Sequence, residues 1–142
     1  MKLATYKTLW GHSSSLESAI QQIIQARFDG LEGPAPANKA EALQLKILLD
    51  EAGIDFIAEI TTAGTYVPER HASLQHHLGS FAAKLENCLP LEPGFITCLG
   101  GCDAWSEQQS AEFFGNAMEL AASAGLQVCF ETHRSRSLFN PW

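Results

Sequence analysis

A carboxylate and an imidazole lie two residues apart near the end of the sequence. The apolar run 126–130, LQVCF, predicts a short β-strand, and Glu131 and His133 follow it directly. Residues two positions apart in an extended chain point to the same face. A carboxylate on an inward face is costly unless a cation or a hydrogen-bond donor stabilises it. We therefore predict that Glu131 and His133 belong to a functional site.

Other polar and aromatic residues also collect where predicted strands end. Trp10 ends the first apolar run and His12 follows it, Glu32 lies in the second, and Trp105 lies shortly after the fourth. Ligands of parallel α/β folds bind at the carboxyl ends of the strands, so these four residues are candidate site residues. Each also has a structural interpretation, as a solvated carboxylate, a loop residue or a packing residue. For Glu59, in the third run, we favour the structural interpretation, a paired carboxylate at the edge of the core.

Five apolar runs alternate with four helical patterns. The strands are expected at 3–10, 31–33, 54–60, 95–99 and 126–130. The pairs expected to cap helices are Ser14 with Glu17, Asn38 with Glu41, and Ser106 with Gln109. Gly53 and Gly125 are expected to end the second and fourth helices.

The helical spacing also predicts which side chains are buried. In the last helix, Phe114, Met118 and Ala121 are expected to face the core. The histidines of the third helix are expected on its solvated face: His71, His76 and His77.

Strand–helix alternation predicts parallel strands joined by right-handed crossovers. Two architectures fit: a five-stranded flavodoxin-like doubly wound sheet, with strand order 2-1-3-4-5, or the first five units of a TIM-type (β/α)8 barrel, with order 1-2-3-4-5. The stretch Arg134–Trp142 is too short for the helix that a doubly wound sheet needs after its fifth strand. The sequence therefore favours a partial barrel, a single incomplete domain over residues 1–142.

The composition excludes several classes of protein. The formal charge is −7, from 16 acidic and 9 basic residues, which disfavours binding to nucleic acid.

No secretory signal and no apolar run long enough to span a membrane is present, so we expect a cytoplasmic protein without a membrane partner. The four cysteines lack the paired spacing of a zinc site, and Cys98 and Cys129 are expected to be buried in strands.

Two segments resemble the xylose isomerase-like TIM-barrel superfamily, of the sugar phosphate isomerase/epimerase type. They are ARFDGLEG, at the second strand, and VCFETHRSRSLFNPW, at the fifth. The superfamily includes sugar isomerases, ketose epimerases and the endonuclease IV branch, and the resemblance covers the chain as five successive βα units.

The resemblance implies roles for the candidate residues. Glu131 would be a ligand of a divalent metal (Mn, Mg, Co or Zn) and a proton-transfer group, and His133 would contact substrate oxygens. Glu32 would face the substrate, and Trp10, His12 and Trp105 would wall the sugar pocket. The family's other metal ligands come from strands six to eight, which this sequence lacks. We therefore expect the N-terminal portion of a sugar isomerase or epimerase that is inactive in isolation. A divalent metal is expected for the full-length family, and its position in this chain can be unoccupied.

Two alternatives stay open, and so does the question of whether this chain alone is an enzyme. An endonuclease IV-like phosphodiesterase needs histidines after strands three and four, where the sequence reads ITTAGTY and CLGGCDAW. A non-catalytic half-barrel would associate through its open strand edges, with a second copy or with a complementary C-terminal half. The expected small-molecule partner is a sugar or polyol.

Overall fold

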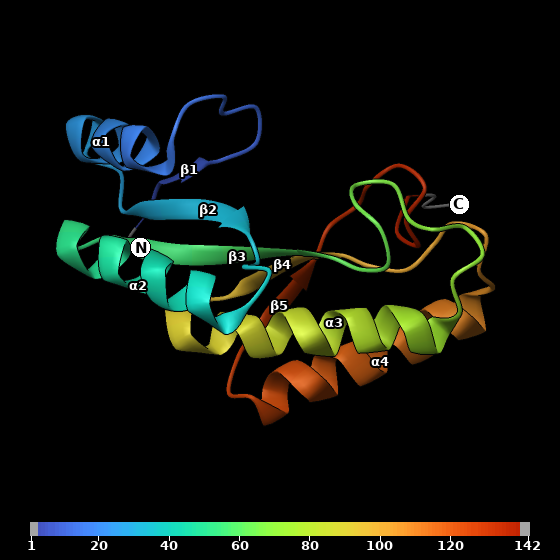
Figure 1. Ribbon diagram of the computed structural model, residues 1–142. Helices are drawn as coiled ribbons and strands as arrows, with labels where there is room; N and C mark the ends of the chain where they lie inside the picture. The colour runs from blue at the N-terminus through green and yellow to red at the C-terminus, as the bar shows by residue number, and fades with distance from the viewer. Residues whose placement is uncertain (1–2, 140–142) are drawn as a thin grey trace.

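Five parallel strands form one sheet, and their order follows the sequence, β1-β2-β3-β4-β5 (Figure 1). The computed structural model describes residues 3–139. This strand order confirms the partial TIM-type barrel and excludes the flavodoxin-like order. The elements are β1 (Tyr6–Thr8), α1 (Leu16–Ala26), β2 (Gly30–Pro34), α2 (Lys39–Ala52), β3 (Asp55–Thr61), α3 (Leu74–Cys88), the 3-10 helix η1 (Leu89–Leu91), β4 (Ile96–Leu99), α4 (Glu107–Ser123) and β5 (Val128–Phe130).

Most of the expected helix caps are present. The Asn38 side chain accepts from the Glu41 amide at α2, and Ser106 and Gln109 form a reciprocal capping box at α4. Gly53 ends α2 in the left-handed conformation, with φ of 64°. The prediction for α1 was wrong by one residue, because Ser15, and not Ser14, accepts the Ser18 amide as the N-cap.

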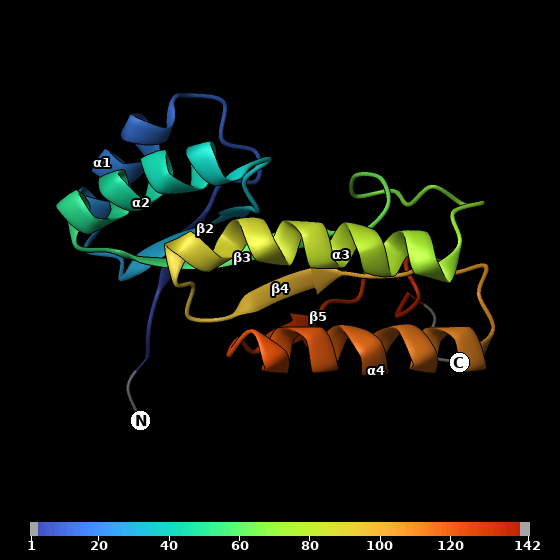
Figure 2. The same ribbon diagram turned by 60° about the horizontal axis from the view of Figure 1, so that its bottom comes forward.

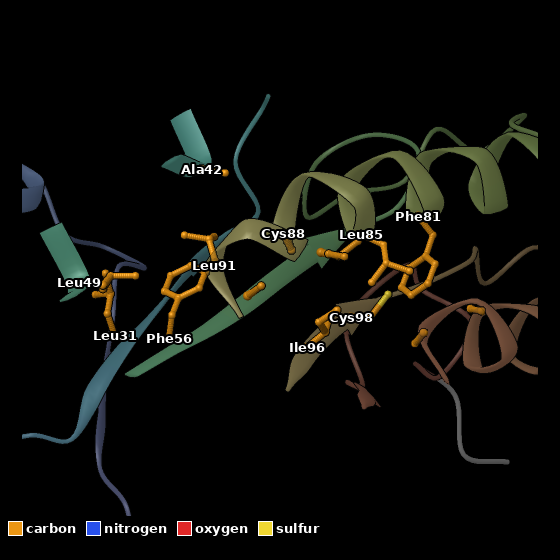
Figure 3. Packing of buried hydrophobic residues seen from close by; sticks show 14 of the residues in the cluster. Leu31, Ala42, Leu49, Phe56, Phe81, Leu85, Cys88, Leu91, Ile96 and Cys98 are labelled. Carbon is orange, nitrogen blue, oxygen red and sulfur yellow. The ribbon is translucent and has the colours of Figure 1, made fainter. Parts of the chain in front are cut away.

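The hydrophobic core lies between the sheet and helices α1 to α4, and α3 and α4 lie side by side in Figure 2. Alternate strand residues and the inner helix faces fill it; Figure 3 labels Leu31, Ala42, Leu49, Phe56, Phe81, Leu85, Cys88, Leu91, Ile96 and Cys98. In α4 the predicted inner face was partly wrong. The buried residues are Phe113, Ala117 and Ala121, and the Met118 side chain is 56% exposed.

The other face of the sheet carries most of the polar strand residues. Val128 and Phe130 pack against the core, so Cys129 and Glu131 point to the opposite face. The prediction that Cys129 is buried was wrong, because its thiol lies on this exposed face, whereas Cys98 is buried as expected. The opposite face is therefore the one that can present ligand-binding groups.

The loops after β3, β4 and β5 gather at the carboxyl ends of the strands (Figure 1). This edge, which we call the mouth, is where ligands bind in parallel α/β folds. No helix of the described part of the chain, residues 3–139, combines the length and apolar character needed to cross a membrane.

Candidate functional site

A cavity of about 200 Å³ opens at the mouth. Three glutamates from three different strand ends line it, together with an imidazole, two aromatic rings, a threonine and a buried leucine. The lining residues are Thr8, Trp10, Glu32, Glu59, Tyr66, Leu99, Glu131 and His133. We call this cavity the acidic pocket.

Strand alternation and register bring these side chains together. Thr8 pairs with Glu32 across β1 and β2, and Glu59 pairs with Thr97 across β3 and β4. The Thr97 hydroxyl donates to Glu32 Oε1 at 3.4 Å, which links β4 to β2 across the face. The Glu131 amide donates to Cys98 O at 3.0 Å and so extends the pairing of β4 and β5 by one residue. The sheet register thus fixes where each carboxylate emerges.

The three carboxylates influence one another. Burial raises the pKa of Glu59, and the charges of Glu131 and Glu32 raise it further, whereas a hydrogen bond from Tyr66 and the nearby His133 lower it. Burial and the charge of Glu32 also raise the pKa of Glu131, against the opposing effect of His133. Two carboxyl groups of the pocket therefore hold a proton more readily than an ordinary glutamic acid, a property suited to general acid–base work.

Tyr66 is the central aromatic group of the acidic pocket. Its ring centroid lies 6.0 Å from that of Trp10 and 6.0 Å from that of His133. Its hydroxyl hydrogen-bonds to Glu59, and burial raises the pKa of Tyr66, followed by the charge of Glu59. His133 Nδ1 lies 3.0 Å from the Arg134 carbonyl, which can only accept, so the bond places a proton on Nδ1.

The structure brings together four of the six predicted site residues. Trp10, Glu32, Glu131 and His133 line the acidic pocket. Their catalytic, binding and metal-ligating roles stay predictions.

The other two predicted residues lie elsewhere. His12 Nε2 lies 3.1 Å from the Ser15 carbonyl, at the start of α1. The Trp105 ring packs edge-to-face on His77, with centroids 4.7 Å apart, and on Phe113. The structural interpretations, a loop residue and a packing residue, describe these two positions better than a place in the pocket wall.

Sequence reasoning missed four of the eight lining residues, Thr8, Glu59, Tyr66 and Leu99, and two of these, Glu59 and Tyr66, are ionisable. Glu59 had been interpreted as a structural carboxylate, yet its side chain lines the cavity. Glu59 lies two residues after Ile57, which pairs with Glu32 across β2 and β3. Strand alternation therefore places Glu59 on the same face as Glu32, and this was a usable signal. Tyr66 lies in the loop after β3, where no periodicity exists, so only the folded structure places it.

The described residues do not fit a divalent metal by themselves. Among residues 3–139, no three histidine, cysteine, aspartate or glutamate side chains converge closely enough to hold a metal ion. The pocket carboxylates are thus grouped around a cavity and do not converge on a single point. A divalent cation prefers roughly six oxygen or nitrogen ligands, which the pocket residues alone do not supply.

Removing the Tyr66 hydroxyl tests the electrostatics of the acidic pocket. In Tyr66→Phe we expect the pKa of Glu59 to rise further, because the hydrogen bond that favours its charged form is lost. A pH titration of the glutamate side-chain carboxyl carbons by ¹³C NMR measures this. Tyr6→Phe removes a hydroxyl that interacts with Asp55 instead, and should leave Glu59 unchanged. An unchanged or lower Glu59 pKa in Tyr66→Phe would contradict the stabilising hydrogen bond from Tyr66 to the Glu59 carboxylate.

Comparison with known proteins gives similarity in structure only. No family model matches the sequence, and no curated protein matches it. Among solved structures, a xylose isomerase-like TIM barrel/4-hydroxyphenylpyruvate dioxygenase fusion protein matches with TM-score 0.74 and 19% identity, over 96% of this chain and 23% of that chain. D-psicose 3-epimerase from Clostridium cellulolyticum H10 gives TM-score 0.69 and 14% identity, over 93% and 52%. The IolI protein with a bound zinc atom gives 0.70 and 12%, over 97% and 54%.

An AP endonuclease of family 2 from Brucella melitensis has the same fold, with TM-score 0.69 and 14% identity, over 92% of this chain and 55% of that chain. The chain thus spans about half the length, or less, of these proteins. Identities this low carry the fold and not the activity. The resemblance found in the sequence is confirmed at this level: the chain has the fold of the first part of a xylose isomerase-like TIM barrel.

Proposed function

We propose that this chain is the N-terminal portion of a sugar isomerase or epimerase, and that it binds a ketose or related polyol in the acidic pocket. The observation that carries the proposal is the convergence of Glu32, Glu59 and Glu131, from three strands, on one cavity with Tyr66 and His133. The similarity in fold to D-psicose 3-epimerases supports this choice of substrate class.

The pocket has the groups that a polyol needs. Carboxylate oxygens and His133 Nε2 accept hydrogen bonds from sugar hydroxyls, and the rings of Trp10 and Tyr66 offer apolar surface to the C–H face of a sugar. Glu59 and Glu131, with raised pKa values, are suited to take and return a proton at a carbon beside a carbonyl. These features favour binding and proton transfer on a neutral sugar.

We further propose that the chain by itself does not turn the sugar over. The described residues hold no metal on their own. In the proposal, the enzyme is metal-dependent, Glu131 provides one metal ligand, and the remaining ligands come from outside residues 3–139.

Direct binding measurements test this function. We expect D-fructose and D-psicose to bind with a dissociation constant on the order of 1 mM, the weak end of enzyme–substrate affinities. Isothermal titration calorimetry measures the affinity, and Glu131→Gln or Glu59→Gln should weaken it about tenfold, the effect of roughly one charge-assisted hydrogen bond. An epimerisation assay with Mn²⁺ should show no turnover.

A matched control separates the pocket from general surface charge. Glu119→Gln changes the same chemical group at an exposed position of α4 and should leave sugar affinity unchanged. Absence of sugar binding in the wild-type chain would reject the binding proposal. Robust epimerisation by the chain alone would reject its inactivity.

A second candidate function is association as a half-barrel. The observation that favours it is the strand order, which leaves β1 and β5 as the edges of the sheet in the described part of the chain. A second copy or a complementary half that pairs with both edges would extend the sheet. Light scattering on the purified chain distinguishes a monomer from a self-associated form, and a stable monomer would count against self-association.

A further inference from the structure

Arg136 is a buried arginine in the segment after β5. Its side chain is 0% exposed, although no periodic element holds it. Burying a guanidinium is costly unless its donors are satisfied. The described ion pairs do not include Arg136, so its charge is stabilised by neutral acceptors.

These acceptors are backbone carbonyls of two other loops. Nη1 donates to Thr62 O at 2.6 Å and to Gly101 O at 3.2 Å. Nη2 donates to Thr65 O, and Nε donates to Tyr66 O at 3.4 Å. One side chain thus connects the loops after β3 and β4 to the segment after β5, which lie together at the mouth in Figure 1.

The backbone around Arg136 is fixed as well. Its amide donates to His133 O at 3.0 Å, and the Ser137 amide donates to Gly100 O at 3.3 Å. The Ser137 hydroxyl donates to Cys102 O at 3.1 Å. Gly101, with φ of 69°, leaves no room for a side chain there, because an added Cβ would lie 2.1 Å from Ser137 Oγ. The backbone from which the guanidinium extends is therefore held in place by hydrogen bonds.

The loop that Arg136 holds carries Tyr66. The carbonyls of Thr65 and Tyr66 accept hydrogen bonds from the guanidinium. An isolated antiparallel β-bridge between Gly64 and Pro68 closes the same turn. The Tyr66 ring lies next to the rings of both Trp10 and His133, and its hydroxyl hydrogen-bonds to Glu59. The loop after β3 contains no helix or strand, so its conformation depends on side-chain bonds such as these, together with the bond from the Ala63 amide to Ser80 Oγ of α3.

We infer that Arg136 is a positioning residue of the acidic pocket: its bonds to the loop after β3 hold the Tyr66 ring next to the rings of Trp10 and His133. The placement of the ring follows from the geometry alone. Its consequence for sugar affinity rests on the proposed function.

Two readouts test the inference, nuclear Overhauser effects between ring protons and affinity for D-fructose. In wild type we expect cross-peaks from the Tyr66 ring to the rings of Trp10 and His133, since the centroids lie 6.0 Å apart. In Arg136→Gln we expect these cross-peaks to disappear and the dissociation constant to rise about tenfold. Arg136→Lys keeps the charge but cannot span both loops, so we expect weakened cross-peaks and an intermediate affinity.

Two controls separate positioning from other effects. Arg134→Gln removes an exposed charge two residues away and should leave both readouts unchanged. Leu49→Ala destabilises the core at α2 and should leave the Tyr66 cross-peaks intact.

Each outcome decides the inference. Intact cross-peaks in Arg136→Gln, or equal losses in Leu49→Ala, would overturn it. If Arg136→Gln does not fold, Arg136→Lys decides, because a wild-type set of cross-peaks there would likewise overturn the inference. If the wild-type chain binds no D-fructose, the proposed function fails while the cross-peaks still judge the role of Arg136.

Discussion

Truncation of Phe113 to alanine is expected to lower the free energy of unfolding by about 4 kcal/mol, within the range for buried phenylalanines. The Phe113 side chain is 0% exposed on α4. Its ring packs on four others, in T-shaped contacts with centroid distances of 5.4–6.3 Å: His77, Trp105, Phe114 and Phe130. Edge-to-face pairs add about 0.5–1.5 kcal/mol each to the effect of burial.

The same ring also contacts the sheet directly. An added Cβ on Gly100 would lie 2.5 Å from Phe113 Cε1, so ring and backbone are as close as a glycine permits. Phe113 thus joins α4 to the end of β4, and its removal leaves a cavity at the base of the mouth. Urea unfolding followed by circular dichroism measures the change.

The adjacent residue gives a matched control. Phe114→Ala removes the same group one position along α4, where the ring is only partly buried. We expect roughly half the destabilisation there, because part of that ring is already in water. A Phe114→Ala effect equal to or larger than that of Phe113→Ala would show that α4 presents the face predicted from sequence.

The sequence predicted the architecture because strand and helix patterns alternate without ambiguity. Five apolar runs separated by capped helices leave few topologies, and the barrel order, which we favoured, is the one that the structure has. Helix faces were harder to predict. In α4 two adjacent phenylalanines fit the periodicity nearly equally. Both rings pack on Phe130 of β5, and it is the contacts with His77 and Trp105 that distinguish Phe113.

Two of the three pocket carboxylates were predicted from the sequence, and Glu59 of β3 was not. Glu32 and Glu131 were found because a carboxylate in an apolar run stands out, and strand alternation then fixes its face. Tyr66 and Arg136 lie in loops, whose conformation depends on contacts distant in sequence. A buried arginine also contradicts the general rule that charged residues are exposed, so composition gave no signal for it.

His77 shows how a polar residue can be missed on a helix. It was expected on the solvated face of α3, yet its side chain is 0% exposed. The spacing of His77, Phe81, Leu85 and Cys88 follows one helix face and was a usable signal. Its polarity is accommodated by one hydrogen bond, to Thr62 Oγ1 at 2.7 Å.

The surrounding bonds determine the protonation of His77. Thr62 Oγ1 accepts from the Gly101 amide at 3.2 Å and from Arg136 Nη1 at 3.4 Å, so its own proton is directed to His77 Nδ1. The proton of the neutral ring is then on Nε2, which is buried and finds no hydrogen-bond partner among the described residues. Burial, followed by the charges of Arg136 and His76, lowers the pKa of His77 to about 4. A protonated ring carries a proton on Nδ1 as well and could no longer accept the hydrogen bond from Thr62 Oγ1.

The stability of the fold is therefore expected to fall with acid through His77. The unfolded chain takes up the proton near pH 6.5 and the folded chain only near pH 4, so the stabilising contribution, complete above pH 6.5, is lost as the pH falls through this window. The expected loss is about 3 kcal/mol, at 1.36 kcal/mol for each pKa unit. Glu59 and Glu131, whose pKa values are raised on folding, act in the opposite sense, so absolute stability mixes several groups.

Comparison of variants isolates the contribution of His77. Urea unfolding of wild type and His77→Gln at intervals between pH 7 and pH 4 gives the stability difference at each pH. We expect the wild-type advantage to shrink by about 3 kcal/mol over that range, because glutamine keeps an acceptor for Thr62 but does not titrate. His76→Gln, the exposed neighbour, should leave the pH dependence nearly unchanged. A constant difference between wild type and His77→Gln would mean that the buried imidazole is protonated as readily in the folded chain as in the unfolded one, and that the bond to Thr62 does not hold it neutral.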